Sequence, residues 1–487
     1  MRSTSPYYSP FRTYILTLGL MTVLTSVGGG VLYLYGTGQS LPAHLQVAGW
    51  KPGAIPYMQF QTQLDEQLAL YASLRVHLAS PSPDIASMDL SLGELGLAIH
   101  RGPLDEAMER MFHASLTDRI AARWSLRKVQ LPLQITIDQD KLRAIVKQTW
   151  KELYNYHPTA AMRIVNPDDT IRYEPERGVL RLDTTTLQKE IEAQLPPFSS
   201  PSNPLKPLKL PVPIYTELPS VTMDSLRRQG VERKISEFTT TFPVSGQGRI
   251  HNIRSTAASI QDMLLAPNET FDYSKIIEQT EAKFGYQEAP VILNGKLVPG
   301  IGGGICQVSS TLYNAVLRSG LEIVERRSHS LPVSYVPLGQ DATFASGYIN
   351  FKFRNSTDAY ILIRTISTDR DVTVKLFGRI SPSTTYDIES KIIETIQPTV
   401  KYLHNPSMRS GSIKPISAGK EGYVVETYRY RKLNGAVVSK ELISKDRYSP
   451  VPALVASNRG DIKPEEGNPD ENGKPLLEDG VKGPSFR

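Results

Sequence analysis

A stretch of mostly apolar residues from Thr13 to Tyr35 contains no charged side chain. At about 1.5 Å per residue, a helix of this length spans the hydrocarbon layer of a membrane. Two arginines precede the stretch, and basic residues favour the cytoplasmic side. We therefore predict a cytoplasmic tail at 1–12 and a single transmembrane helix at 13–36. The rest of the chain is predicted to lie outside the cytoplasm. A cleaved signal peptide is the alternative, but the segment is long and lacks a clear small-x-small cleavage site.

Two units of mixed periodicity follow, at 44–129 and 130–237. In the first, apolar spacings of three and four predict helices over 59–78 and 104–116, and alternation predicts a strand over 88–92. This unit is therefore expected to be α+β.

The second unit opens with apolar residues that alternate from 131 to 137, which predicts a strand. Asp138 and Asp183 each precede a helical pattern and are expected N-caps. The segment 196–204 is rich in proline and serine and predicts a loop, and a strand is expected at 212–215. This unit is also predicted to be α+β.

The third unit, 238–380, contains the chemistry discussed below. Its pattern predicts a helix over 252–263 and a strand over 286–297 that turns at Asn294-Gly295. A second hairpin is expected over 359–377. The unit is again α+β.

The last folded unit, 385–458, reads as an elongated all-β domain. Tyrosines and arginines alternate before Asn434-Gly435, which predicts a hairpin turn. The tail 459–487 is rich in glycine, proline and acidic residues and is predicted to be disordered. The whole chain is therefore expected to be an α+β multidomain protein with one N-terminal transmembrane helix.

The charge and the cysteine content of the chain limit the classes of partner and ligand that it can bind. The net charge of the 487 residues is +6 and the isoelectric point is near 9.0, which favours anionic surroundings such as lipid headgroups or acidic wall polymers. No dense basic helix or aromatic-basic array argues for nucleic acid. One cysteine excludes an intramolecular disulfide and a multi-cysteine zinc site. We expect neither a metal nor a cofactor, and the oligomeric state stays open.

The single cysteine, Cys306, follows three glycines and begins an apolar-periodic run that ends near Gly320. This pattern places Cys306 as the first residue of a helix. Unpaired N–H groups and the helix dipole at that position favour a thiolate and lower the pKa of a thiol. The same N–H groups could form an oxyanion hole. A lone cysteine is just as often a small buried hydrophobe, so both interpretations are carried forward.

His329 begins a strand-like run soon after this helix, and a returning strand could bring its imidazole to the thiol. Asp341 is a candidate third group that would orient the imidazole. An aspartate after glycine is more often a turn former, so its place in a triad is the weaker hypothesis.

The motif from Pro299 to Ala315, with Glu325-Arg326 and His329-Ser330 beyond it, resembles the VanW family. Gly285-Tyr286 and Asp341-Ala342-Thr343 fit the same family. The resemblance covers roughly 238–379. In addition, 130–237 is similar to the peptidoglycan-binding domain that precedes VanW domains, and 385–458 resembles a G5 domain.

The resemblance implies a membrane-anchored protein that faces the cell wall of a Gram-positive-type bacterium and contacts peptidoglycan stem peptides and glycan. It implies a cysteine L,D-transpeptidase that makes 3-3 cross-links through a Cys306 thioester, with His329 as base and Asp341 behind it. The expected substrate-binding residues surround the cysteine in sequence or follow the histidine: Gly302, Gly303, Gly304, Gln307, Ser309, Ser310 and Tyr335. Asn350 departs from the family, because many members are expected to have an acidic residue there. A non-catalytic wall-binding or scaffold protein with an inert cysteine is the alternative, and hydrolysis of stem peptides is another.

Overall fold

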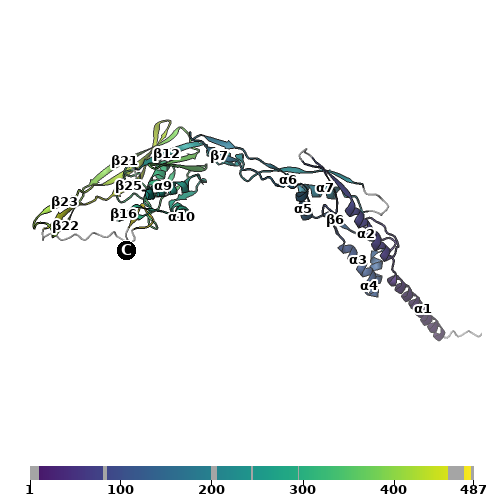
Figure 1. The fold of residues 1–487 in the computed structure, drawn as a ribbon. Helices are drawn as coiled ribbons and strands as arrows, with labels where there is room; N and C mark the ends of the chain where they lie inside the picture. Colours follow the sequence, from purple (N-terminus) through teal and green to yellow (C-terminus); the bar gives the residue numbers. More distant parts are fainter. Residues whose placement is uncertain are drawn as a thin grey trace, which may run out of the picture. The chain divides into compact units, whose positions relative to one another are not determined.

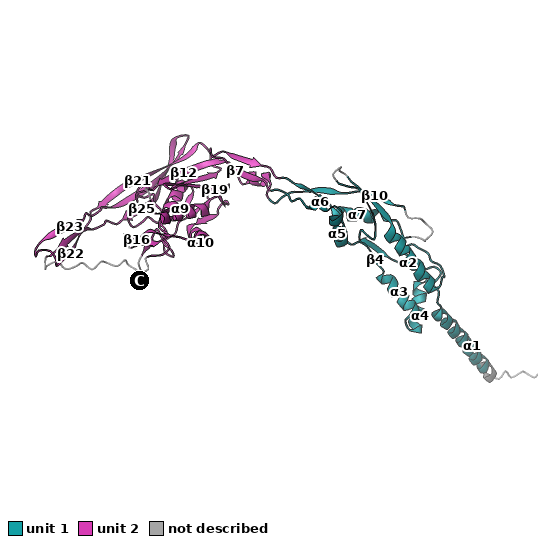
Figure 2. Cartoon of the chain, in the orientation of Figure 1, with its two compact units in different colours: residues 1–159, 177–220 teal, residues 160–176, 221–487 magenta. Residues whose placement is uncertain are grey.

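The computed structural model describes residues 10–80, 85–198, 206–242, 245–293, 295–458 and 476–483. These residues form two compact units, 1–159 with 177–220 and 160–176 with 221–487 (Figure 2). Four sequence predictions fall wholly or partly outside the described residues, namely most of the tail at 1–12, the loop from 199 to 204, the turn residue Asn294, and 459–475 with 484–487 of the C-terminal tail.

The N-terminal helix α1 (Pro10–Thr37) forms where the apolar stretch predicts it. Its segment Tyr14–Thr37 has a mean hydropathy of 1.9 and is long enough to cross a membrane. None of its apolar 18-residue window is buried within the structure, as expected for side chains that face lipid. A membrane anchor and a signal sequence both fit this helix.

The first unit is α+β. Asp138 caps α5 by accepting hydrogen bonds from the backbone N–H groups of Asp140 and Lys141, and Asp183 caps α7 in the same way. Both caps confirm the sequence prediction. The bounds are β1 (Gln46–Val47), α2 (Tyr57–Ser73), β2 (Arg75–Ala79), β3 (Met88–Ser91), β4 (Leu97–His100), α3 (Gly102–Phe112), α4 (Leu116–Leu126), β5 (Gln130–Leu131), β6 (Gln134–Ile137), α5 (Gln139–Thr149), α6 (Lys151–Tyr154), β9 (Val179–Leu182), α7 (Thr184–Gln194), β10 (Leu208–Pro211) and β11 (Ile214–Glu217).

Two features of this unit differ from the sequence prediction. The helix expected over 59–78 ends at Ser73, and 75–79 instead forms β2 between β3 and β10. In β2 buried residues alternate with more exposed ones, as in a strand with one face on the core. The apolar residues of this segment were therefore wrongly assigned to the helix. One apolar core extends from Leu41 to Val212, on both sides of the boundary expected near residue 129.

The second unit contains a four-stranded sheet with the order β12-β20-β19-β13. Strand β12 of this sheet and helix α9 are labelled in Figure 1. Helix α11 packs against β12 and β20, and α9 packs against β19. The bounds are β7 (Met162–Val165), β8 (Ile171–Glu174), α8 (Met223–Arg228), β12 (Arg233–Thr241), α9 (Gln247–Ile260), β13 (Met263–Leu265), β14 (Thr270–Asp272), α10 (Tyr273–Phe284), β15 (Glu288–Leu293), β16 (Lys296–Ile301), α11 (Ile305–Arg318), β17 (Glu322–Glu325), β18 (Lys352–Arg354), β19 (Ile361–Ser367) and β20 (Asp371–Gly378).

Helix α11 is central to this unit because every residue from Ile305 to Leu317 is buried. A helix surrounded on all sides must satisfy its polar side chains internally. Ser309 donates to the carbonyl of Ala342 at 2.6 Å, and Asn314 donates to the carbonyl of Gln340 at 2.6 Å. The helix thereby holds the segment that precedes residue 343 against its own surface.

The C-terminal strands form two three-stranded sheets, β21-β24-β25 and β22-β26-β23. Asn434 and Gly435 both have positive φ, as a two-residue hairpin turn of the predicted kind requires. The bounds are β21 (Thr384–Ile396), β22 (Val400–His404), β23 (Ile413–Ser417), β24 (Gly422–Leu433), β25 (Ala436–Tyr448) and β26 (Ala453–Ser457).

Part of the tail predicted to be disordered is ordered in the structure. Residues 477–478 form β27, which pairs antiparallel with Ile292 and Leu293 of β15. Lys482 then pairs with Ile301 in a β-bridge. The prediction was wrong here because composition cannot show that a distant sheet edge is available to the segment.

Candidate active site

The glycine loop fits its surroundings tightly. Gly302 and Gly304 have φ of +94° and +106°, a backbone region that residues with a Cβ rarely adopt. Gly303 has an ordinary φ, but a Cβ there would lie 2.2 Å from the carbonyl oxygen of Pro290. The loop therefore requires glycine for backbone geometry and close packing.

Cys306 is the second residue of α11 and not the first, because the helix begins at Ile305 after the N-cap Gly304. Its Sγ accepts a hydrogen bond from the backbone N–H of Phe344 at 3.1 Å and lies 3.7 Å from Oγ1 of Thr343. The residue is 0% exposed. Cys306 thus lies under the segment that leads away from Asp341.

His329 and Asp341 form a tight buried pair. Nδ1 of His329 lies 2.6 Å from Oδ2 of Asp341, and the backbone N–H of His329 donates to the same oxygen at 2.7 Å. Tyr448 donates its hydroxyl proton to Oδ1 of Asp341 at 2.5 Å, and Arg326 lies 3.3 Å away. A carboxylate at Nδ1 requires the proton on that nitrogen, which leaves Nε2 for another partner.

Electrostatics couple this pair to the cysteine. Burial by itself would lower the pKa of His329, but hydrogen bonding to Asp341 and Cys306 and their charges outweigh it and raise that pKa well above 6.5. Burial would raise the pKa of Asp341, yet His329 and then Arg326 lower it to about 2. Among the described residues, Nε2 of His329 is buried without a partner that meets hydrogen-bond distance and angle limits. Because the thiol and the imidazole still perturb each other's pKa, we place them close together without an ideal hydrogen bond.

The environment of the thiol corrects the expectation of an exposed, activated sulfur. Burial raises the pKa of Cys306 above 9.0, and the charge of Asp479 raises it further, while His329 lowers it only in part. Oδ1 of Asp479 accepts hydrogen bonds from the N–H groups of Gly304 and Cys306, at 3.1 and 2.8 Å. The helix N-terminus therefore already binds an anion, the carboxylate of Asp479. The prediction that it stabilises a thiolate at Cys306 is wrong for this arrangement.

One further sequence expectation differs. His329 does not begin a strand, since β17 ends at Glu325 and His329 lies in the irregular segment after it. Asn350 accepts from the backbone N–H of Ser274 and donates to Asp272, so its contacts stabilise the start of α10.

The remaining predicted substrate residues face the interior. Gln307 is 0% exposed and bonds to Arg249 and Thr240. Ser310 accepts from the N–H of Ala342 at 3.0 Å, and Ser309 donates to the carbonyl of the same residue. Tyr335 is different, because its hydroxyl is buried without a hydrogen-bond partner in the described part of the chain. Burial raises its pKa, and so do the charges of Asp479 and Cys306, which places this hydroxyl near the thiol.

Comparison with known proteins identifies the two C-terminal segments. The family model described as "VanW like protein" matches residues 248–377, and the G5 domain model matches residues 388–457. The chain carries a VanW-like domain followed by a G5 domain. The resemblance drawn from the glycine–cysteine motif is thereby confirmed.

Two curated relatives each match about a third of the chain. The chain is 42% identical over 158 residues to the protein YoaR of Bacillus subtilis (strain 168), which covers 32% of this chain and 52% of YoaR. It is 28% identical over 156 residues to the vancomycin B-type resistance protein VanW of Enterococcus faecalis (strain ATCC 700802 / V583), which covers 31% of this chain and 57% of that protein. The chain thus spans about half the length of the curated relatives it matches. A solved structure of an IgA1 protease G5 domain is 27% identical to this chain, and the match has a TM-score of 0.13. The match covers 16% of this chain and 92% of the solved domain.

The sequence reasoning missed the residues that link the VanW-like domain to the G5 strands. Arg326 forms a bidentate pair with Asp446 of β25 at 2.6 Å to each oxygen. Tyr448 accepts from the N–H of Gly339 at 2.7 Å while it donates to Asp341. The G5 strand β25 therefore helps to hold the carboxylate behind His329. Asp446 and Tyr448 are the buried residues of β25, and their burial depends on contacts with a distant part of the chain that no local sequence pattern indicates.

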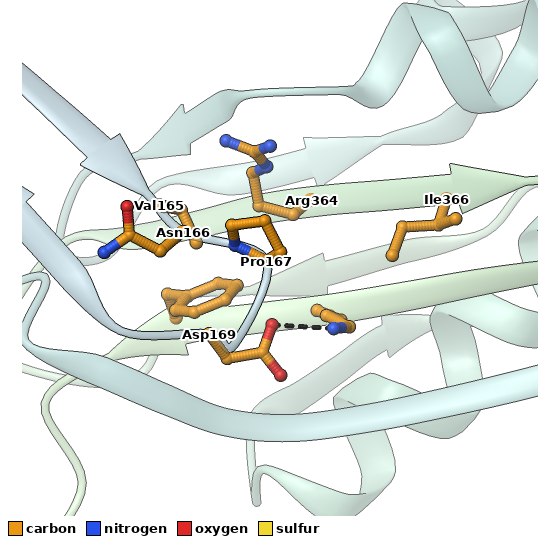
Figure 3. A pocket seen from close by; sticks show the side chains of 8 residues that line it. Val165, Asn166, Pro167, Asp169, Arg364 and Ile366 are labelled. Atoms are coloured by element: carbon orange, nitrogen blue, oxygen red, sulfur yellow. Dashed lines mark hydrogen bonds and ion pairs between the residues drawn. The ribbon is translucent and has the colours of Figure 1, made fainter.

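A hollow of about 140 Å³ lies elsewhere in the same unit, between the β7–β8 turn and the sheet of β19 and β20 (Figure 3). Asp169 closes one side by pairing with Lys375 at 2.6 Å and with Lys234 at 2.5 Å. The hollow contains no nucleophile or unpaired acid, so the cysteine region of the VanW-like domain is the better candidate. No group of three or more metal-ligating side chains occurs in the ranges that the structure describes.

Proposed function

We propose that this protein acts on peptidoglycan in the cell envelope as a cysteine L,D-transpeptidase. One observation supports the proposal above the others. Two backbone N–H groups converge on a single anionic oxygen at the N-terminus of α11, beside a thiol and an imidazole that a buried carboxylate orients. Acyl transfer through a covalent intermediate needs these three parts, namely a nucleophile, an oriented base and an oxyanion site.

In the proposed reaction, Sγ of Cys306 attacks the carbonyl carbon between the third stem residue and the terminal D-alanine. Because the pKa of His329 is raised, the reaction starts from the fraction of the protein in which Nε2 is unprotonated. Nε2 then takes the thiol proton, the S–C bond forms as the C–N bond breaks, and the same proton passes to the departing amine. An acceptor amine then attacks the thioester, forms a new C–N bond and returns its proton through His329 to sulfur. Asp341 holds the imidazole in the required tautomer throughout.

The N–H groups of Gly304 and Cys306 are the oxyanion donors in this scheme. The neighbouring N–H groups of Ile305 and Gln307 are already bonded to the carbonyls of Gly302 and Gly304. Attack by water in place of the amine would give hydrolysis at the same site. The apolar helix α1 and the G5 domain would keep the VanW-like domain at the wall side of the membrane and in contact with glycan.

A second candidate is a non-catalytic wall-binding or scaffold protein. The full burial of Cys306 and its raised pKa favour this alternative. Under it, the thiol would be a small core residue and the polar cluster a structural joint between the VanW-like domain and the G5 strands.

The test compares the full chain in detergent with its Cys306→Ala variant on muropeptides that contain a tetrapeptide stem. The proposal predicts 3-3 cross-linked products with the natural chain and none with the variant. Binding to purified wall is measured in parallel and should be equal for both. Cross-links from Cys306→Ala would reject the cysteine mechanism.

A further inference from the structure

The segment 476–483 covers the candidate active site from a distant part of the sequence. Strand β27 extends the β16-β15 sheet at the free edge of β15. Beyond it, the N–H of Val481 donates to the carbonyl of Ile301 at 2.8 Å, and Ile301 donates back to the carbonyl of Lys482 at 2.8 Å. The segment is thus bound as an extended peptide is bound, by main-chain hydrogen bonds at a sheet edge.

Two adjacent carboxylates fix this segment over the site. Glu478 is 2% exposed and accepts from the backbone N–H of Ser330 at 3.0 Å and from its hydroxyl. Asp479 is 8% exposed, caps α11 and pairs with Arg249 at 3.4 Å. Buried carboxylates normally require donors of this kind, and here the donors come from the loops that carry the cysteine and the histidine.

The donors that receive Asp479 are shaped for a substrate oxygen. One carboxylate oxygen accepts from two converging N–H groups, as the oxygen of a tetrahedral intermediate would. Two buried polar atoms lie in the same region: Nε2 of His329 interacts with Cys306, and the hydroxyl of Tyr335 interacts with Ser310. Neither atom makes a hydrogen bond that meets distance and angle limits among the described residues, so both can accept a better partner from a ligand that enters the site.

We propose that residues 477–482 are an internal ligand that occupies the binding cleft of an extended, carboxylate-bearing peptide and keeps the site closed. The incoming peptide adds to the edge of β15, its acidic groups replace Glu478 and Asp479, and the N–H groups of Gly304 and Cys306 become free for the reacting carbonyl. The identity of the peptide as a peptidoglycan stem rests on the proposed function, whereas the closure by the tail does not.

The closure is tested by the rate at which iodoacetamide alkylates Cys306 in the full chain. The double variant Glu478→Ala/Asp479→Ala removes both carboxylates and should alkylate roughly tenfold to a hundredfold faster than the natural chain, since two charge-assisted hydrogen-bond sites are lost. Asp369→Ala is the matched control, because Asp369 pairs with Arg254 on the surface. It should alkylate as slowly as the natural chain.

A synthetic peptide with the sequence of residues 476–483, added to the double variant, should restore slow alkylation, and a scrambled peptide should not. The isosteric variant Glu478→Gln/Asp479→Asn repeats the test with the side-chain volume kept. Unchanged alkylation in both variants would overturn the inference, and so would fast alkylation that the peptide fails to reverse.

The same variants separate this inference from the proposed function. If the tail controls alkylation but no variant forms a thioester with muropeptide, the inference stands and the transpeptidase proposal fails. If the natural chain and the double variant cross-link muropeptides at equal rates, the tail inference fails and the proposed function stands.

Discussion

Replacing Asp341 by asparagine perturbs the joint between His329, α11 and the G5 strand β25. The carboxylate of Asp341 is 1% exposed and accepts from His329 twice, from Tyr448 and from Arg326. Asparagine keeps the shape but removes the charge and one acceptor oxygen. We expect this single change to loosen the whole site.

The magnitude follows from the depressed pKa of Asp341. A fall from 3.8 to about 2, at about 1.4 kcal/mol per pKa unit, corresponds to about 2.5 kcal/mol of stabilisation by the ionised group. Because the folded pKa is the lower one, this contribution is present above the unfolded value near 3.8 and is lost as pH falls through about 2. At neutral pH the variant should therefore lose about 2.5 kcal/mol of local stability.

Hydrogen–deuterium exchange of the amides of α11 and β25, read by mass spectrometry, measures this loss. When the free energy of local opening falls by about 2.5 kcal/mol, amides that exchange through that opening should exchange about sixtyfold faster. The difference from the natural chain should shrink as pH falls from about 4 towards about 2, and Asp369→Asn should leave α11 unchanged. Tryptophan fluorescence would not serve, since Trp50, Trp124 and Trp150 all lie in the first unit. Less than a threefold acceleration in Asp341→Asn at neutral pH would refute the assignment of Asp341 as the support of this site.

Three further outcomes are expected. Tyr448→Phe removes a donor to Asp341 and the acceptor of a buried N–H, so exchange in β25 should report a loss of about 1–3 kcal/mol; unchanged exchange would contradict the described contact. Gly303→Ala places a Cβ against main chain and should lower the thermal midpoint of the second unit, whereas Gly246→Ala, with open space around its Cβ, should not. The pH midpoint for alkylation of Cys306 should lie above about 9 in the natural chain, because burial and Asp479 raise the pKa of the thiol; a midpoint near neutrality would show that the closed arrangement is wrong.

Local features of this fold were predictable because they depend on neighbours in sequence. Asp138 and Asp183 cap helices whose first N–H groups lie two and three residues away. Gly320 has φ of +72° directly after the C-cap of α11, as its position beyond the apolar run indicated. The glycine–cysteine motif likewise fixed a loop and a helix start to within one residue.

The state of the thiol was not predictable, because it depends on a contact across 173 residues between Asp479 and the N–H of Cys306. The tail has the composition of a solvated segment, and nothing in its local pattern distinguishes Asp479 from other acidic residues around it. The link from Tyr448 to Asp341 also spans 107 residues. Sequence reasoning therefore named Cys306, His329 and Asp341, but not Asp479 at the start of α11 or Tyr448 beside Asp341.

We propose that Cys306 becomes an acyl carrier when an acidic peptide enters the site. Intact-protein and peptide mass spectrometry tests this proposal after the natural chain and Glu478→Ala/Asp479→Ala have been incubated with tetrapeptide muropeptide. We expect an acyl adduct on Cys306 with loss of terminal D-alanine, at higher occupancy in the double variant and absent in Cys306→Ala. An open, alkylatable Cys306 that never acquires the adduct would contradict it.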